Sequence, residues 1–509
     1  MIKKPYLVHP FLFAILSAVF LWGQNFGEAP LREVLPTLIV LIVFGGLVLF
    51  FSWIFFRDFG KSAIISSVFL LITLSFDYIY NIFFYNSFIQ LRWRWAFFAL
   101  FLMFAVLLLL IKKTKRDLSN VNRAMAIAVG IFVLISLFQV VAGYYTAYMD
   151  VRHNDMKIVV DDGETSQLRD IYYIILDGYS SQEVIKDVMG LEEIDETVAF
   201  FREKGFFIAD KSKSNYPQTL FSLPSSLNMR YLQDPSAHKR HFILAEDHQV
   251  KDFLKLYGYK YFHFGADAFT YFNRYADENI NLGLFSPYQT AVWHSTLFRP
   301  VQNLFGDRFD ALANKFKFLD RRLIQWEREK FKLQKLAEIP NKENLPVFVF
   351  AHFLVPKGPC VFDENGDFLT EEECENRGVI KNYLDHVVYI NKEIENLVNI
   401  LLENSDPEPI IIVQGDHGFP FYDYRDVIEE FAQPDRARKL IVPGKYSFPI
   451  FNAYYFPGGG DQLLYDSITP VNTFRILFNY YFGQNLDLLD DISYTVDPDD
   501  DSRFIPWNK

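Results

Sequence analysis

The sequence predicts an α/β protein in two parts, a five-helix transmembrane anchor followed by an α/β domain with a largely parallel central sheet. Three observations lead to this expectation. Residues 1–150 carry 12 Lys and Arg against 6 Asp and Glu, whereas the other residues carry 38 against 56. Long apolar runs fill the first part, and short apolar runs alternate with helical patterns in the second. A basic, apolar front joined to an acidic back is typical of a membrane anchor with an attached soluble domain. The acidic balance also argues against a nucleic-acid partner, because phosphate neutralisation needs a cationic surface.

The anchor is predicted from its apolar runs, most of which approach or exceed the roughly 20 residues that cross a bilayer. They lie near residues 8–24, 34–56, 62–84, 94–111 and 122–144. Lys3 and Lys4 before the first run suggest a signal peptide, but no small-residue cleavage site follows and four further runs do. We therefore expect a retained helix. Asp77 is the one acid at membrane depth in these runs. Such residues are often functional, and a position that faces neighbouring helices near the interface explains it equally well.

Basic residues in the short loops predict the orientation of the anchor. One set of alternate loops holds Lys3, Lys4, Arg57, Lys61, Lys112, Lys113, Lys115, Arg116 and Arg123, and the opposite set holds Arg32, Arg92 and Arg94. Because basic residues favour the cytoplasmic side, the set with nine of them is expected inside the cell, together with the N-terminus. With five spans, everything after about residue 145 then lies outside the cytoplasm.

The remainder reads as a polar linker (146–170) and an α/β domain (171–485). Strand-like apolar runs occupy residues 171–176, 259–264, 347–355, 410–414 and 448–456. Apolar residues at three- and four-residue steps predict a core helix from Tyr383 to Leu401. Continuous apolar strands between helices are typical of a buried, largely parallel sheet. We expect the region that contains "KFLDRRLIQWEREKFKLQKL" to shape the substrate mouth, although a solvated helix explains its charges individually. An acidic C-terminal tail is expected over 486–509.

Two strand ends carry polar side chains. "IYYIILDGYS" delivers Asp177, and "IIIVQGDHG" delivers Asp416 and His417. In parallel sheets ligands bind just past such carboxyl ends. Between them in sequence lies the hydroxyl-rich "NYPQTLFSLPSSLN", which contains Thr219 and is either a polar turn or a nucleophile at a helix start. Two carboxylates, an imidazole and a hydroxyl suit Zn²⁺ or Mn²⁺ better than Ca²⁺.

The order strand–Asp-Gly, "TLFS", strand–"GDHG" resembles the sulfatase-fold branch of the alkaline phosphatase superfamily. With helices ahead of an exported domain, the chain is similar to lipoteichoic acid synthases and lipid A phosphoethanolamine transferases over essentially its whole length. The resemblance implies a Thr nucleophile in a Thr-x-x-Ser-x-Pro pattern, which Thr219, Ser222 and Pro224 match. It also implies one divalent metal ion held by Asp177, Thr219, Asp416 and His417. An unmodified Thr is not converted to formylglycine, as the Cys or Ser of sulfatases is.

The chain departs from this pattern at one strand end. "HFLVPKGP" keeps His352, but Lys357 stands where the transferases have a second His, and no further His follows "GDHG". A second metal ion is therefore in doubt. Lys357, His352 and Ser222 are the candidate substrate-binding residues, with Lys357 as a cationic donor to a phosphate oxygen. His352 is as readily explained as a core residue, and Lys357 is also compatible with a degenerate site.

Three functions remain open on the sequence. The first is a membrane enzyme that transfers or hydrolyses a phosphate ester outside the cytoplasm, acting on a membrane lipid or envelope glycan. The second is a sulfate or phosphate ester hydrolase acting on extracellular glycans, and the third is a non-catalytic member of the fold.

The chain has two cysteines, Cys360 and Cys374, both in the part that is expected to be exported. An oxidising compartment favours a disulfide between them, with two reduced thiols as the alternative.

Overall fold

A computed structural model describes residues 8–25, 29–85, 92–151, 168–266, 270–283, 285–298, 321–340, 345–420 and 445–507. The chain divides into two compact units. Unit 1 comprises Met1–Met149 and Leu284–Phe316, and unit 2 comprises Asp150–Gly283 and Lys317–Lys509. The chain thus leaves unit 1, returns to it, and leaves it again.

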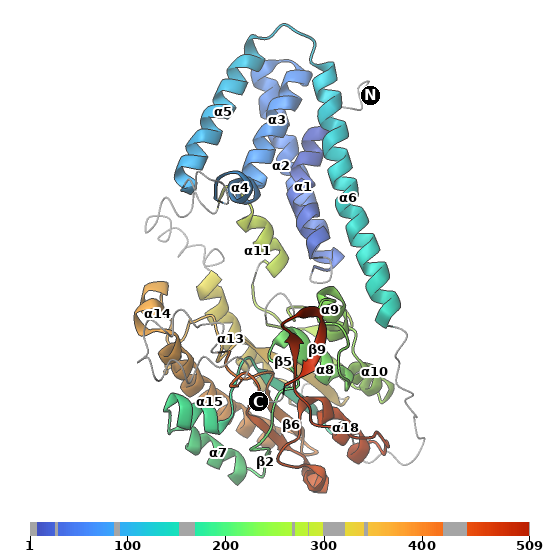
Figure 1. The fold of residues 1–509 in the computed structure, drawn as a ribbon, viewed down its shortest axis with the longest axis vertical. Helices are drawn as coiled ribbons and strands as arrows, with labels where there is room; N and C mark the ends of the chain where they lie inside the picture. Colours follow the sequence, from blue (N-terminus) through green and yellow to red (C-terminus); the bar gives the residue numbers. More distant parts are fainter. Residues whose placement is uncertain are drawn as a thin grey trace. The chain divides into compact units, whose positions relative to one another are not determined.

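Unit 2 is built on a seven-stranded sheet in the order β2-β7-β6-β1-β5-β3-β4. Figure 1 labels three of its strands, β2, β5 and β6. Its strands are β1 (Ile171–Leu176), β2 (Phe207–Ile208), β3 (Lys260–Phe264), β4 (Glu278–Asn279), β5 (Val347–Phe353), β6 (Ile410–Gly415) and β7 (Asn452–Tyr455). The central strand β1 runs parallel to both β5 and β6, β3 and β4 continue the parallel part, and β7 and β2 add antiparallel pairs at one edge. The largely parallel sheet is confirmed, and five of its strands are those predicted from the apolar runs.

Helices cover both faces of this sheet. The helical elements of unit 2 are η4 (Val184–Met189), α7 (Ile194–Glu203), α8 (Thr219–Asn228), α9 (His238–Glu246), α10 (Gln249–Leu256), α13 (Arg321–Ala337), α14 (Glu371–Arg377), α15 (Val379–Asn404), η7 (Pro457–Leu463) and α18 (Pro470–Tyr481). Alternate residues of β1 enter two separate cores, one with η4, α7, α13 and α15 and the other with α8, α10 and α18. Because side chains alternate along a strand, a fully buried apolar strand such as β1 supplies both cores. The predicted apolar stripe of α15 lies in the first core.

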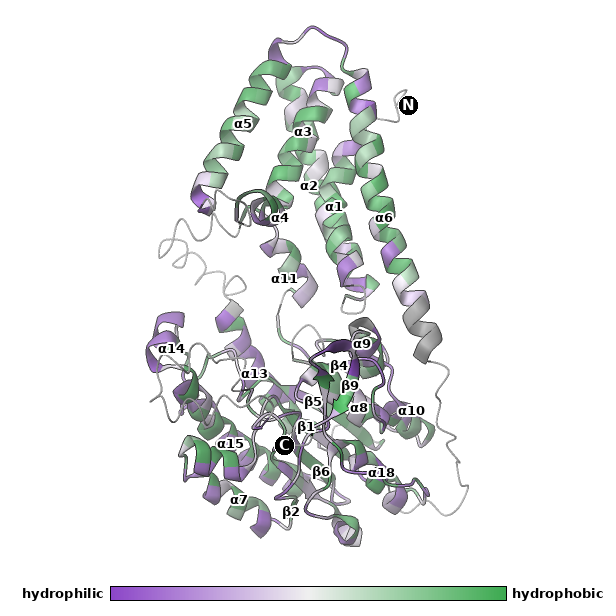
Figure 2. Ribbon diagram, viewed as in Figure 1, coloured by the Kyte–Doolittle hydropathy of each residue, from purple (hydrophilic) through white to green (hydrophobic). Residues whose placement is uncertain are grey.

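Unit 1 contains the apolar helices, which Figure 2 shows mostly in green. They are α1 (His9–Gln24), α2 (Leu31–Phe56), α3 (Phe59–Leu74), α4 (Phe76–Tyr80) with η2 (Asn81–Tyr85), α5 (Trp93–Lys113) and α6 (Ser119–Val151). Among the described residues three helices are long and apolar enough to cross a membrane, or up to four if the bent pair Phe59–Leu74 and Phe76–Tyr85 is one span. His9–Gln24 is apolar but shorter. The chain is therefore a membrane protein, and the expected count of five spans is not confirmed.

Two segments differ from their expected description. Residues 494–506, within the expected acidic tail, form a hairpin of β8 (Tyr494–Asp497) and β9 (Asp500–Pro506). Phe504 of this hairpin packs on Tyr216 and Phe221, with ring centroids 4.8 and 5.1 Å apart, so the hairpin contacts the segment that leads into α8.

The charged helix α13 is solvated on one face only, which corrects the expectation of a solvated helix. Its Glu329 and Lys332 are fully buried, with Lys332 Nζ 3.0 Å from Glu329 Oε1. Opposite charges three residues apart lie on one helix face, and here that face is turned into the protein. The sequence alone does not distinguish a buried ion pair from an exposed one.

Candidate metal and nucleophile site

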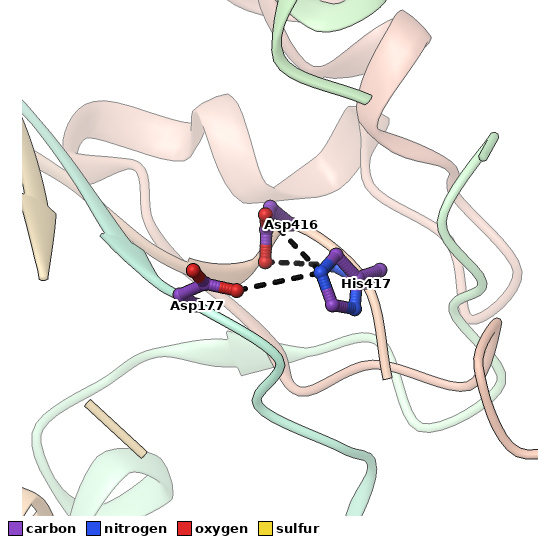
Figure 3. Close-up of side chains that lie close together, drawn as sticks. All are labelled: Asp177, Asp416 and His417. Atoms are coloured by element: carbon purple, nitrogen blue, oxygen red, sulfur yellow. Dashed lines mark hydrogen bonds and ion pairs between the residues drawn. The ribbon is translucent and has the colours of Figure 1, made fainter. Parts of the chain in front are cut away.

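The candidate site forms where two neighbouring strands end. Leu176 of β1 pairs with Gly415 of β6, so Asp177 and Asp416 leave the sheet at equivalent positions, although they are 239 residues apart. His417 follows directly. Figure 3 shows the carboxylates of Asp177 and Asp416 beside the imidazole ring of His417. The three residues are buried, and each offers one ligand atom within 4.8 Å of the others.

Both carboxylates have an oxygen that lacks a hydrogen bond. Asp416 Oδ1 accepts hydrogen bonds from the backbone N–H groups of Gly178 and His417, each at 2.9 Å. Asp416 Oδ2 is buried and accepts none in the described part of the chain. Asp177 Oδ1 is also buried and meets no hydrogen-bond geometry there, but the Lys357 ammonium pairs with it at 3.2 Å. A buried carboxylate oxygen without a partner is costly, and a cation is the usual remedy.

The imidazole of His417 is oriented to offer Nε2 to the same space. Its Nδ1 lies 2.7 Å from the carbonyl oxygen of Gly418, which can only accept, so the Nδ1–H donates there. A hydrogen bond of this kind fixes the tautomer of a metal-ligating His. Burial by itself lowers the pKa of His417, but the Asp416 and Asp177 carboxylates raise it overall.

The distances from His417 Nε2 to the other three candidate ligand atoms are close to those around a divalent ion. Nε2 of His417 lies 3.3 Å from Asp177 Oδ1, 3.7 Å from Asp416 Oδ2 and 3.4 Å from Thr219 Oγ1. A tetrahedral Zn²⁺ with bonds of about 2.0–2.2 Å separates its ligand atoms by roughly 3.3–3.6 Å. These residues fit a divalent metal ion, with one nitrogen and three oxygens.

Thr219 is the first residue of α8, as expected for a hydroxyl at a helix start. The serines behind it do not cap the helix, because Gln218 is the N-cap residue and no side chain caps the helix. Instead, the hydroxyl of Ser222 donates to the carbonyl oxygen of Asp416 at 2.5 Å. Ser222 thereby joins the first turn of α8 to the end of β6 and holds Thr219 beside His417.

Lys357 belongs to the same group of side chains. Its Nζ lies 3.2 Å from both Asp177 Oδ1 and His417 Nε2, and its backbone N–H donates to the carbonyl oxygen of Asp177. Burial by itself raises the pKa of Asp177, but the Lys357 ammonium and His417 hold it well below its usual range. Gly178 makes the close approach possible: it has a φ of 69°, and a Cβ there would lie 3.0 Å from the Cβ of Lys357.

No hydrogen bond joins His352 to this group in the described residues, although its imidazole interacts electrostatically with Asp177, Asp416 and Lys357. His352 is buried in β5, its Nδ1 is 2.8 Å from the hydroxyl of Thr270, and its Nε2 has no hydrogen-bond partner in the described residues. Burial lowers the pKa of His352 to about 4, although Asp177 and Asp416 are near enough to oppose the shift. Lys332 of α13 donates to the His352 carbonyl oxygen at 2.6 Å.

Sequence reasoning missed the residues that arrange the site. The Asp-Gly turn after β1 was a signal for Gly178, since such turns often need a positive φ. Lys332 and Thr270 gave no signal in the sequence, because their contacts with His352 of β5 join residues that are 20 and 82 positions apart.

The predicted disulfide Cys360–Cys374 is confirmed, with the two Cα atoms 6.1 Å apart.

No protein-family model and no curated protein sequence matches the chain. Among solved structures, it is similar to the C-terminal periplasmic domain of EcEptC from Escherichia coli, at 12% identity and a TM-score of 0.42, over 68% of this chain and 94% of that one. Lipoteichoic acid synthase LtaP from Listeria monocytogenes matches at 12% identity and a TM-score of 0.39, over 64% and 76%. The integral membrane protein lipooligosaccharide phosphoethanolamine transferase A from Neisseria meningitidis matches at 12% and 0.37, over 90% and 89%. Because these identities and TM-scores are low, we base the function on the residues of this chain.

Proposed function

We propose that the chain is a membrane-anchored, metal-dependent enzyme that transfers or hydrolyses a phosphate ester through Thr219. The observation that carries this proposal is the position of the Thr219 hydroxyl, 3.4 Å from His417 Nε2, at the start of a ten-residue helix. A nucleophile in a covalent route splits one difficult displacement into two easier ones. The N-terminus of α8 favours the anionic phosphoryl group that the nucleophile receives.

Each residue of the site has a role in this proposal. Asp177, Asp416, His417 and Thr219 hold the divalent ion, which lowers the pKa of the Thr219 hydroxyl and screens charge on the phosphoryl oxygens when bound. The Thr219 Oγ–phosphorus bond forms as the bond to the leaving oxygen breaks; the Thr219 hydroxyl releases its proton to water, and water returns a proton to the leaving oxygen. Lys357 donates to a phosphoryl oxygen, and Ser222 holds the first turn of α8 against the end of β6. An acceptor hydroxyl or water then takes the phosphoryl group from Thr219.

The substrate class follows from the membrane unit. We propose that unit 2 lies outside the cytoplasm of the plasma or inner membrane, on the nine-to-three distribution of basic residues between the two sets of loops. The assignment of these basic residues to two opposite sides of the membrane requires five spans. A domain held at a membrane surface meets lipid head groups or envelope glycans, and we propose one of these as donor or acceptor.

The experiment is capture of the covalent intermediate. Purified full-length protein with Zn²⁺ or Mn²⁺ is mixed with bis(p-nitrophenyl) phosphate, quenched in acid and digested. Mass spectrometry is expected to find the transferred nitrophenyl phosphate on the peptide that contains Thr219. Release of p-nitrophenol without any adduct, and its persistence in Thr219→Ala, would exclude Thr219 as the nucleophile.

One alternative, a non-catalytic protein, is favoured by a specific observation, the 3.2 Å approach of Lys357 to Asp177. An internal ammonium beside a carboxylate competes with a metal ion for it. Metal analysis of the purified protein separates the two functions, since the enzyme is expected to hold one ion and the degenerate site none.

A further inference from the structure

A short segment from the second half of the sequence folds with the N-terminal helices. Leu284–Phe316 belongs to unit 1, whereas β4 before it and α13 after it belong to unit 2. Its described part, residues 285–298, contains α11 (Pro287–His294), which begins with a capping box formed by Ser286 and Gln289. We call residues 285–298 the returning segment.

The returning segment supplies hydrogen bonds where the third apolar run is broken. The run bends by 79° between α3 and α4, at Ser75. The backbone N–H of Leu297 donates to the carbonyl oxygen of Thr73 at 2.7 Å, and the N–H of Asp77 donates to the carbonyl oxygen of Ser295 at 3.1 Å. The Ser295 hydroxyl adds a longer contact of 3.4 Å to the carbonyl oxygen of Leu74. Irregular backbone at membrane depth is tolerated only where protein satisfies its polar groups.

Side chains of the same segment are packed into the helices of unit 1. Tyr288 and Val292, one turn apart on α11, are 6% and 5% exposed. They share a core with residues of α1, α2 and α3, among them Ala18, Leu41 and Leu70. The Tyr288 hydroxyl donates to the carbonyl oxygen of Ala18 at 2.9 Å.

The outer face of the returning segment is aromatic. Phe285, Trp293 and Phe298 are 43%, 39% and 41% exposed, and the rings of Trp293 and Phe298 stack with centroids 4.9 Å apart. Trp side chains are enriched at membrane–water interfaces, and Trp293 belongs to this face. The segment thus combines a face that fits the helices with a face that suits the bilayer surface.

We propose that the returning segment is a second attachment of the catalytic domain to the membrane unit, independent of the linker at 146–170. Two tethers raise the effective concentration of the domain at its anchor, so that loss of one does not free it. The docked segment is also part of the membrane unit itself, because it completes the hydrogen bonding of the broken run. This attachment goes beyond the proposed function and does not depend on it.

The first test cuts the linker in the full-length protein. A protease site is inserted between Glu164 and Thr165, membranes are cleaved and washed, and the fragment from residue 165 onward is followed. We expect this fragment to sediment with the membranes. Val292→Asp, which places a carboxylate in the apolar contact, is expected to release it after cleavage. Ala291→Asp, the same change at the neighbouring exposed position, is the matched control and is expected to keep it bound.

Release of the unsubstituted fragment, or equal retention of both variants, would overturn the proposal. A covalent trap gives a second readout that does not depend on Val292→Asp folding. Backbone hydrogen-bonded partners have Cα atoms about 5–6 Å apart, within reach of a disulfide. In the cleaved double variant Thr73→Cys and Leu297→Cys, we expect the two fragments to run as one band until reduced. The native cysteines cannot produce that band, since both lie in the C-terminal fragment, and Thr73→Cys alone is the control. Separate fragments in the double variant contradict the docking.

Discussion

Nε2 of His417 lies 3.4 Å from the hydroxyl of Thr219, although the two residues are 198 positions apart in the sequence. The contact joins the start of α8 to the end of β6, and the Ser222 hydroxyl spans the same junction through the carbonyl oxygen of Asp416. A hydroxyl, an imidazole nitrogen and two buried carboxylate oxygens therefore face one another.

Thr219→Ala is expected to abolish turnover of a phosphate ester, because it removes the nucleophilic oxygen, while Thr219→Ser keeps part of the rate. Ser222→Ala is expected to slow the enzyme without stopping it, since it loosens α8 from β6. Ser225→Ala is the matched control, because the Ser225 hydroxyl donates to the carbonyl oxygen of Arg230, just beyond the C-terminal end of α8 and away from β6. Steady-state rates of hydrolysis of p-nitrophenyl phosphate esters compare the turnover of these variants. An inactive Ser222→Ala beside an active Thr219→Ala would reassign the nucleophile.

Asp416→Asn is expected to remove the bound metal ion, because it replaces the carboxylate whose Oδ2 is left without a hydrogen bond. The purified protein should hold one ion per chain, and adding that ion should raise its Tm by mass action. Asp466→Asn is the control, since this half-exposed carboxylate pairs with Lys211. Metal analysis and thermal melts provide the measurements. Two ions per chain, or full metal content in Asp416→Asn, would contradict the site as described.

Lys357→Met is expected to lower kcat about tenfold or more, which corresponds to roughly 1.4 kcal/mol of transition-state stabilisation. The substitution keeps an unbranched side chain beside Gly178 but removes the ammonium that faces the phosphoryl group. Metal content should be unchanged, since Lys357 is not a ligand. Lys204→Met, at an exposed position, is the control. A rise in kcat or in metal affinity would show that Lys357 blocks the site.

Unit 2 is expected to lose stability as the pH falls from about 6.5 towards 4, partly through His386. Burial lowers the pKa of His386 to about 4, and its Nδ1 donates to the carbonyl oxygen of Pro356, next to Lys357. His386 takes up a proton near pH 6.5 in the unfolded chain but only near pH 4 in the folded protein. Its contribution to the free energy of unfolding is therefore fully present above about pH 6.5. Below that pH the contribution declines, by at most about 1.4 kcal/mol per pH unit.

His386→Gln should be less stable at neutral pH but should show a flatter Tm profile between pH 6.5 and 4. Its amide can replace part of the hydrogen bonding without titrating. Parallel profiles for the two proteins would assign the acid sensitivity to other groups.

A phosphatase reporter fused after residue 150 is expected to be active, and one fused within residues 112–123 inactive. The physical reason is the nine basic residues that a five-span anchor would put on one side of the membrane. The opposite result would place unit 2 in the cytoplasm and remove the proposed exported site.

The sequence by itself determined the local features of this protein. Apolar runs that end in Asp177 and in Asp416-His417 predicted β1 and β6, because a strand buried on both faces needs continuous apolar residues and its end is free to be polar. The hydroxyl-rich turn predicted a helix start at Thr219, and α8 begins there. These signals extend over fewer than ten residues, and neighbouring residues are sufficient to produce them.

The tertiary structure alone decided which distant segments meet. Nothing local in residues 285–298 pairs them with Thr73 and Asp77, and nothing local turns Glu329 and Lys332 of α13 inward. The same holds for the hairpin that packs on Tyr216, where an acidic composition suggested a solvated tail. Such contacts depend on which buried surfaces and unsatisfied backbone groups the rest of the fold leaves to be covered, and a linear pattern does not record them.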